Sequence, residues 1–133
     1  MKCCFVGHRD CFGIEEKIDA SIEKLMRNGV RRFYSGGMGN FDKMCEKSVK
    51  KLGGRLIFVP YNVKQIKEEH RAWHDEIVCP FGGKAYEKND IPNRNKWMVD
   101  YSDIVISYVY KPGGANVTLN YAKRANKFIV DLT

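Results

Sequence analysis

Apolar residues along the chain follow two kinds of spacing, and the two kinds alternate. Short continuous apolar runs are typical of buried parallel strands, and they occur at 2–7, 31–35, 55–60, 103–110 and 127–132. Between these runs, apolar residues recur every three or four positions, as on one face of an amphipathic helix. This spacing predicts helices over about 14–27, 41–52, 63–78, 96–102 and 114–126.

Strands that alternate with helices predict an α/β fold with a parallel sheet. We expect a single-domain, Rossmann-like fold over residues 1–133, with five strands in the flavodoxin-like order 3-2-1-4-5 and helices on both faces. Such sheets bind ligands beyond the carboxyl ends of their strands, where the winding direction changes. Three loops leave these ends and are expected to converge, namely GHRD (7–10), SGGMGNFD (35–42) and YKPGGAN (110–116).

Residues 80–95 interrupt this pattern. The segment PFGGKAYEKNDIPNRN holds two prolines and two glycines and shows little apolar periodicity. This composition is typical of a surface loop, and a loop of this length often serves function. We therefore predict a lid over the ligand.

Composition also indicates the cellular compartment that we expect for the protein. With 133 residues and 44% hydrophobic content, the chain can bury the core of one domain. No apolar stretch reaches the roughly 18 residues of a membrane span, and the start lacks the pattern of a signal peptide. The five cysteines form no C-x-x-C pair, and the neighbours Cys3 and Cys4 should point to opposite faces of a strand. We expect a cytoplasmic protein with reduced thiols and no membrane partner.

The formal net charge of +7 suits a partner that carries phosphates. Lysine and arginine are nevertheless spread along the chain, and the densest run, KSVKKLGGR (47–55), lies on one predicted helix and its exit. A solvated basic face explains this distribution as well. Sequence-independent DNA binding would need a clustered basic face, which the sequence does not reveal.

The glycine-rich turns suit a phosphorylated ligand. Glycine lets a backbone approach a ligand closely, and helices starting near Gly39 and Gly114 would direct free N–H groups at an anion. Arg9 could add a two-pronged hydrogen bond. The familiar nucleotide motifs do not fit, because there is no G-K-[ST] and Asp42 stands where G-x-G-x-x-G requires its last glycine. No cofactor is expected, and a glycine-rich turn also serves plain packing of a helix against a strand.

Four segments together resemble a known family. CCFVGHRD, YSGGMGNFDKMCEKSV, NRNKWMVDYSDIVISYV and GGANVTLNYAKR resemble, in order and spacing, the small bacterial and phage proteins of the YspA-like branch of the SLOG superfamily. That superfamily is related to the DNA-processing protein DprA, to the "lonely guy" phosphoribohydrolases and to ligand-sensing modules of antiviral systems. The resemblance covers nearly the whole chain. It implies a Rossmann-like fold that binds a nucleotide or a nucleotide-derived ligand, such as an ADP-ribose or NAD-like compound.

The resemblance also implies which residues bind the ligand. By position they are Gly7, His8 and Arg9; Gly36, Gly37 and Asp42; Asn93, Arg94 and Asn95; and Gly113, Gly114 and Thr118. Ser35, Gly39 and Asn116 lie in the same turns and join the expected site. We expect Arg9 and Arg94 to hold phosphate.

One departure concerns catalysis. The phosphoribohydrolases carry P-G-G-x-G-T-x-E-E, whereas PGGANVTLN has Asn116, Leu119 and Asn120 in place of the third glycine and the two acids. Asp42 and Glu46 are four residues apart at a helix start and should share a face beside the crevice. Either carboxylate could orient ribose hydroxyls or support glycosidic cleavage. An acid in a first helical turn also simply favours the helix dipole.

His70 and His74 have a spacing that can bind zinc, but no H-E-x-x-H accompanies them. We expect core or interface histidines and no metal site. Trp97, beside the NRN segment, is expected in the core, with stacking on a base as the alternative.

Two functions of different classes stay open. The first is a sensor or sequestering module that binds a nucleotide-derived small molecule. The second is an N-glycosidase that uses Asp42 or Glu46. DprA-like DNA binding is a third interpretation, and pairing with a second copy of the chain is left open.

Overall fold

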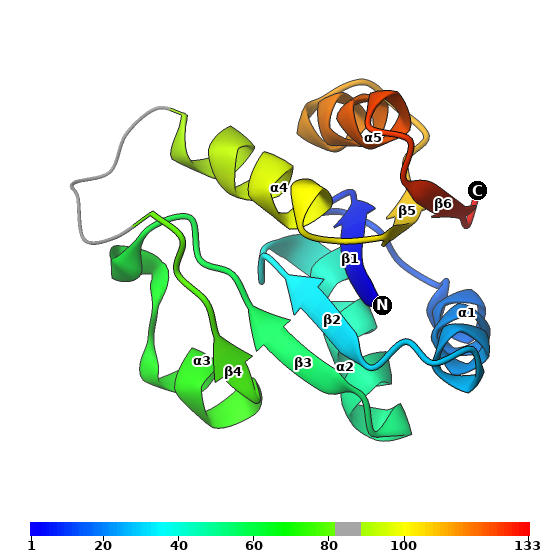
Figure 1. Cartoon of the computed structure of the whole chain (residues 1–133), viewed down its shortest axis with the longest axis horizontal. Coiled ribbons are helices and arrows are strands. Elements are labelled where there is room, and N and C mark those ends of the chain that lie inside the picture. The colour runs from blue at the N-terminus through cyan, green and yellow to red at the C-terminus, as the bar shows by residue number, and fades with distance from the viewer. Residues whose placement is uncertain (82–88) are drawn as a thin grey trace.

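The computed structural model describes residues 1–81 and 89–133 and contains one parallel sheet (Figure 1). The sheet has six strands in the order β4-β3-β2-β1-β5-β6. The strands are β1 (Lys2–Gly7), β2 (Arg32–Ser35), β3 (Arg55–Phe58), β4 (Glu76–Ile77), β5 (Ile104–Tyr108) and β6 (Phe128–Asp131). The α/β class is confirmed, but the predicted five-stranded order 3-2-1-4-5 is wrong, because the short β4 adds a strand beside β3.

Helices cover both faces of the sheet. They are α1 (Glu15–Arg27), α2 (Gly39–Leu52), α3 (Glu68–Trp73), α4 (Asp90–Asp100) and α5 (Gly114–Arg124), with a 3₁₀ turn at Val63–Gln65. Alternate residues of β1 serve the two faces, so Cys3 packs with α1 and α2 whereas Cys4 packs with α4 and α5. The expected opposite orientation of this pair is therefore confirmed. The five cysteines are free, and none of the described helices is long and apolar enough to span a membrane.

The predicted helix over 63–78 is confirmed only over the six residues of α3 and is wrong on either side of them. Asn62 caps only the 3₁₀ turn, where its side chain accepts a hydrogen bond from the Lys64 amide. The backbone is then extended at Ile66, and after α3 it is extended again at His74. Glu76 and Ile77 form strand β4, which pairs in parallel with β3. This pairing determines the local structure, although the apolar residues of the segment have helical spacing.

The predicted loop over 80–95 is also wrong in its second half, because α4 already begins at Asp90. Pro92 falls in the first turn of α4, where proline is tolerated since the N–H group of that position has no intrahelical partner. Asn93, Arg94 and Asn95 therefore lie on a helix. Residues 82–88 of the expected lid lie outside the described residues.

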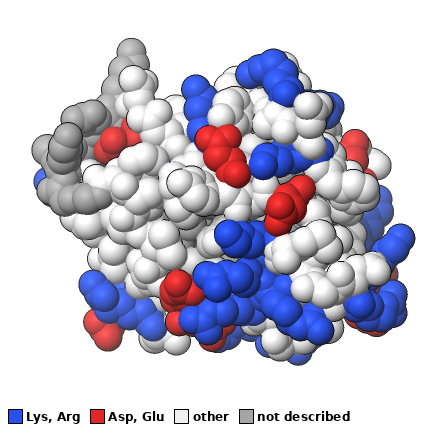
Figure 2. Space-filling view, in the orientation of Figure 1, with Lys and Arg blue, Asp and Glu red and all other residues white. Residues whose placement is uncertain are grey.

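Basic side chains gather at one edge of the molecule, over β2 and β3 (Figure 2). In the register of the sheet, Lys2, Arg32 and Arg55 lie side by side at the amino ends of their strands. Arg32 and Arg55 both pair with Glu76, which offsets part of their charge. The fold thus assembles a basic group that the sequence did not reveal, at the edge opposite the carboxyl ends of the strands.

Candidate functional site

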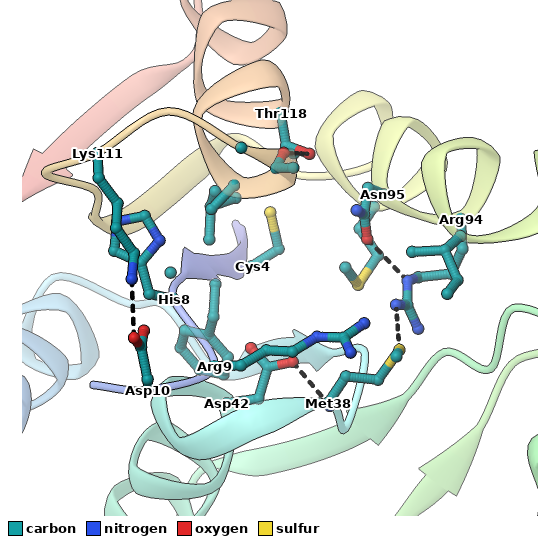
Figure 3. Close-up of a pocket in the computed structure, with 18 of the residues that line it drawn as sticks. Cys4, His8, Arg9, Asp10, Met38, Asp42, Arg94, Asn95, Lys111 and Thr118 are labelled. Atoms are coloured by element: carbon teal, nitrogen blue, oxygen red, sulfur yellow. Dashed lines mark hydrogen bonds and ion pairs between the residues drawn. The ribbon is translucent and has the colours of Figure 1, made fainter. Parts of the chain in front are cut away.

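A cavity of about 430 Å³ opens at the carboxyl ends of β1 and β5. Its walls come from the loop after β1, the start of α2, the inner side of α4 and the start of α5 (Figure 3). This is the switch point of the sheet, because β1 lies between β2 and β5. The volume falls in the range of about 300 to 1,000 Å³ that is usual for small-molecule sites.

The loop after β1 places a neutral histidine in the cavity wall. His8 is buried, and its Nε2 accepts a hydrogen bond from the Tyr110 amide at 3.0 Å. An imidazolium ring has no acceptor nitrogen, so this bond requires the neutral ring. Burial, helped by the charge of Lys111, lowers the pKa of His8 accordingly. We infer that His8 fixes the two loops relative to each other.

Of the cations that line this cavity, Arg9 is the one without a hydrogen bond or ion pair to a described residue. Its side chain is exposed and extends across the cavity between Asp42 and Arg94 (Figure 3). Among residues 1–81 and 89–133, its guanidinium has no hydrogen bond or ion pair. A group with five donors is therefore available to an anion that enters the cavity.

Asp10 and Lys111 form a second charged feature, at the mouth. Their side chains meet at 2.7 Å, and both are largely exposed. The hydrogen bond from Lys111 lowers the pKa of Asp10, and the same bond raises the pKa of Lys111. The pair bridges the loops after β1 and β5 across the entrance.

The glycines of the SGGMG turn accommodate the protein's own groups. A Cβ atom on Gly36 would lie 2.6 Å from Cζ of Arg94, and one on Gly39 would lie 2.6 Å from Cα of Arg9. Gly37 and Gly39 also have positive φ angles of 65° and 87°, which favour glycine. Packing, rather than an approach to the cavity, accounts for glycine at these positions.

The amino end of α2 is likewise occupied from within. The Met38 amide donates to Oδ2 of Asp42 at 3.0 Å, and the Asn40 amide donates to the carbonyl oxygen of Arg9 at 3.0 Å. These amides are among the groups that a bound anion would use. These two amides are therefore not free to bind an anion.

Asp42 lines the cavity, and its carboxyl group has a raised pKa. Its side chain is largely buried, and burial raises the pKa of Asp42 to about 7. The charge of Glu46 acts in the same direction, whereas the Met38 hydrogen bond and the cations Arg94 and Arg9 lower this pKa. A carboxyl group with a pKa near neutrality can exchange a proton at physiological pH, which is the property of a general acid or base.

Arg94 is a buried anchor in the wall of the cavity. Nη1 donates to the carbonyl oxygens of Gly36 and Val59, both at 3.0 Å, and Nε donates to Oδ1 of Asn95 at 2.9 Å. Nη2 contacts the sulfur of Met38 at 3.2 Å. Burial lowers the pKa of Arg94, opposed mainly by the charge of Asp42. Arg94 thus ties α4 to the loops after β2 and β3.

Glu46 does not share the cavity with Asp42. It is buried, accepts a hydrogen bond from Oγ of Ser35 at 2.6 Å, and lies 3.1 Å from Nε2 of His74. It lines a separate pocket beside α3. The expectation that Asp42 and Glu46 lie together beside the crevice is therefore wrong, because Glu46 lies one turn further along α2 and its carboxylate contacts Ser35 and His74.

The histidines beside Glu46 have structural contacts. The ring of His70 stacks on Phe58, with centroids 4.2 Å apart, and Nδ1 of His70 accepts a hydrogen bond from the Lys67 amide. The described residues contain no group of three or more side chains that could hold a metal ion.

The loop after β5 has free space beside its glycines, whereas protein atoms fill the space beside the glycines of the SGGMG turn. Cβ atoms on Gly113 or Gly114 would meet nothing within 4 Å, and Gly113 has a φ angle of 138°. The cap residue of α5 is Gly113, which has no side chain, and no side chain among residues 1–81 and 89–133 accepts a hydrogen bond from the first amides of this helix. Thr118 points toward the cavity one turn later, while its Oγ1 donates to the Gly114 carbonyl oxygen (Figure 3).

The structure therefore brings together only part of the predicted site. Nine predicted residues line the cavity: Gly7, His8, Arg9, Asp42, Arg94, Asn95, Gly113, Gly114 and Thr118. Seven do not: Ser35, Gly36, Gly37, Gly39, Glu46, Asn93 and Asn116. Sequence reasoning missed Cys4, Asp10, Met38, Ile91, Met98 and Lys111. Lys111 could have been found, because it directly precedes the P-G-G turn.

No protein-family model and no curated protein matches the chain by sequence. Solved structures do match. The chain is similar to DNA processing protein A from Helicobacter pylori, with a TM-score of 0.76 and 17% identity over 97% of this chain and 63% of that one. The Helicobacter protein has a single-stranded DNA binding mode.

Two further likenesses point to the same architecture. DprA from Streptococcus pneumoniae matches with a TM-score of 0.77 and 19% identity, over 96% of this chain and 48% of that one. The molybdenum cofactor carrier protein from Chlamydomonas reinhardtii matches with a TM-score of 0.64 and 14% identity, over 98% and 76%. The chain shares the Rossmann-like fold of these proteins. It spans less than two thirds of either DprA chain, and at these identities the likeness establishes the fold alone.

Proposed function

We propose that the cavity binds a nucleoside phosphate or a nucleotide-derived small molecule of the ADP-ribose or NAD type. The observation that carries this proposal is the free guanidinium of Arg9, which extends across a cavity at the switch point of the sheet. An arginine without a partner favours a phosphate, to which it can donate two parallel hydrogen bonds.

In this proposal the phosphate lies at the amino end of α5. The open turn at Gly113 and Gly114 leaves room for an anion, and the first amides and the dipole of α5 attract one. Lys111 adds a second positive charge at the mouth. Arg9 then contacts the phosphate from the opposite wall.

In the same proposal, the ribose of the ligand lies beside Asp42. A carboxylate can accept hydrogen bonds from two ribose hydroxyls, and Asp42 lies on the wall between Arg9 and Met38. Loss of its proton on ligand binding would strengthen those bonds. The five free cysteines support the cytoplasmic location that the sequence predicts for such a module.

Calorimetric titration with AMP, ADP, ADP-ribose and NAD tests the proposal. Arg9→Ala should weaken the binding of the compound that binds best by about 10- to 100-fold, the value of a charge-assisted hydrogen bond. Arg124→Ala is the matched control, because Arg124 is exposed in the last turn of α5, at the other end of that helix from the cavity. Equal affinities of the Arg9→Ala variant and the control would remove the phosphate assignment.

An N-glycosidase that uses Asp42 is the second candidate. The specific observation is the pKa of about 7, which lets this carboxyl group donate or accept a proton during cleavage. Glu46, the other candidate acid, already interacts with Ser35 and His74. Mass spectrometry of the same compounds after incubation separates the two functions, since intact ligand supports binding and a freed base supports the enzyme.

A further inference from the structure

Strand β6 ends the sheet on the side away from β4, and within the part of the chain that the structure describes it pairs with β5 alone. It lies between α5 on one face of the sheet and α1 on the other (Figure 1). Phe128, its first residue, is 65% exposed, although a large apolar side chain favours burial. Natural sheets usually protect such an edge with proline, a bulge or repelling charges, and β6, with the sequence FIVD, has no proline.

The free edge of β6 has a defined set of hydrogen-bonding groups. The Phe128 amide donates to the carbonyl oxygen of Asp103, just before β5, and the Leu132 amide donates to the carbonyl oxygen of Ser107 in β5. Backbone groups alternate in direction along a strand. The N–H and C=O groups of Ile129 and the N–H group of Asp131 therefore face away from the sheet.

We propose that this edge pairs with β6 of a second copy of the chain, in an antiparallel register centred on Ile129. In this register the amide and carbonyl of Ile129 exchange hydrogen bonds with Ile129 of the second copy. The outward amide of Asp131 meets the carbonyl of Lys127 in the same way, and the Lys127 amide is already satisfied by the carbonyl oxygen of Ala122. The two six-stranded sheets thereby become one continuous sheet.

Charge selects this register and this partner. A register centred on Val130 would use the same outward groups, but it would leave Asp131 opposite Ile129. Centring on Ile129 instead places Lys127 of each copy opposite Asp131 of the other, so two oppositely charged pairs flank the centre. The strand is thus complementary to itself, which favours a second copy over an unrelated partner.

The side chains on the two faces agree with this pairing. Val130 packs with the α1 side of the sheet and Ile129 packs with the α5 side. Phe128 shares the α1 face with Val130, because residues two apart lie on one face. In the proposed register each exposed Phe128 lies opposite Val130 of the second copy, beside an apolar groove of about 580 Å³ between β6 and α1.

Sedimentation equilibrium over micromolar concentrations, with matched charge variants, tests this inference. Lys127→Asp and Asp131→Lys each replace attraction with repulsion at both symmetric pairs, so each should raise the dimer dissociation constant about tenfold or more. The double variant Lys127→Asp/Asp131→Lys restores the complementary pairs and should restore the dimer. Arg124→Asp changes the charge by the same amount on α5 and should leave the dimer unchanged.

A second variant tests the backbone pairing. Ile129→Pro removes an outward amide that has no partner among the described residues, and proline is tolerated at such edge positions. It should give a folded monomer, with the fold checked by circular dichroism and thermal melting. A wild-type chain that stays monomeric, or a dimer that survives Ile129→Pro, overturns the inference. Single charge variants that dimerise as well as the double variant overturn the register.

Discussion

Replacing Asp42 with asparagine should stabilise the protein, and the gain should grow as the pH rises. Asparagine keeps the shape of the side chain and an oxygen that can accept the Met38 hydrogen bond. It removes the charge that the largely buried site disfavours. The perturbation therefore isolates the cost of ionising this one group.

The size of the effect follows from the acidity of Asp42. Burial raises its pKa from 3.8 to about 7 in the folded protein. The folded state thus holds the proton more tightly than the unfolded state, so this group destabilises the fold progressively as the pH rises from about 4 to about 7. Three pKa units at 1.36 kcal/mol each set a ceiling of about 4 kcal/mol. Because Asp42 keeps some contact with water, we expect about 2 kcal/mol above pH 7.

Urea denaturation of the wild type and Asp42→Asn at several pH values between 4 and 8 measures this difference. The gain in the free energy of unfolding should be near zero at pH 4 and complete above pH 7. Glu16→Gln, an exposed acid in the first turn of α1, is the control and should change stability little at any pH. A gain that does not vary with pH, or an Asp42→Asn variant that is less stable at pH 7.5, would show that ionisation of Asp42 does not destabilise the fold.

Two further predictions concern the anchor beneath the SGGMG turn, and both are measured by urea denaturation. Gly36→Ala should cost about 1 to 3 kcal/mol, because its Cβ atom would lie 2.6 Å from the Arg94 guanidinium, whereas Gly114→Ala, in open space, should cost less than about 0.5 kcal/mol. Equal costs would contradict this packing. Arg94→Ala should cost about 2 to 5 kcal/mol, because it leaves the buried carbonyl groups of Gly36 and Val59 unpaired. A cost below about 1 kcal/mol would show that Arg94 is no anchor.

Much of the fold could be predicted from the sequence because its cause is local. The run KCCFVG is buried on both faces as β1, and the spacing of Ile18 and Ile22 places both on the inner face of α1. One element has a cause that local patterns do not contain, because β4 exists only where β3 offers it an edge. The start of α4 at Asp90 was missed although it is compatible with a local signal, since proline is tolerated in a first helical turn.

In the candidate site, too, some residues could be predicted from the sequence and others could not. The position of the cavity follows from the strand order, so His8, Arg9 and Gly113 were predicted correctly as lining residues. The glycines at 36 and 39 carry the same local signal as Gly113. Only the fold reveals that Arg94 and Arg9 occupy the space beside them. Sequence alone does not separate a glycine that admits a ligand from one that admits a side chain of the protein.

The proposed function depends on an anion that binds at the amino end of α5, against Arg9. A titration of ¹⁵N-labelled protein with ADP, followed by amide chemical shifts and repeated with Arg9→Ala, tests this binding most directly. We expect saturable shifts that are largest at Gly113, Gly114 and Ala115 and that spare the amides of Gly36 and Gly37. The variant should need about ten times more ADP. Shifts centred on the lysine-lined pocket beside α3, or an Arg9→Ala titration identical to that of the wild type, would contradict this proposal.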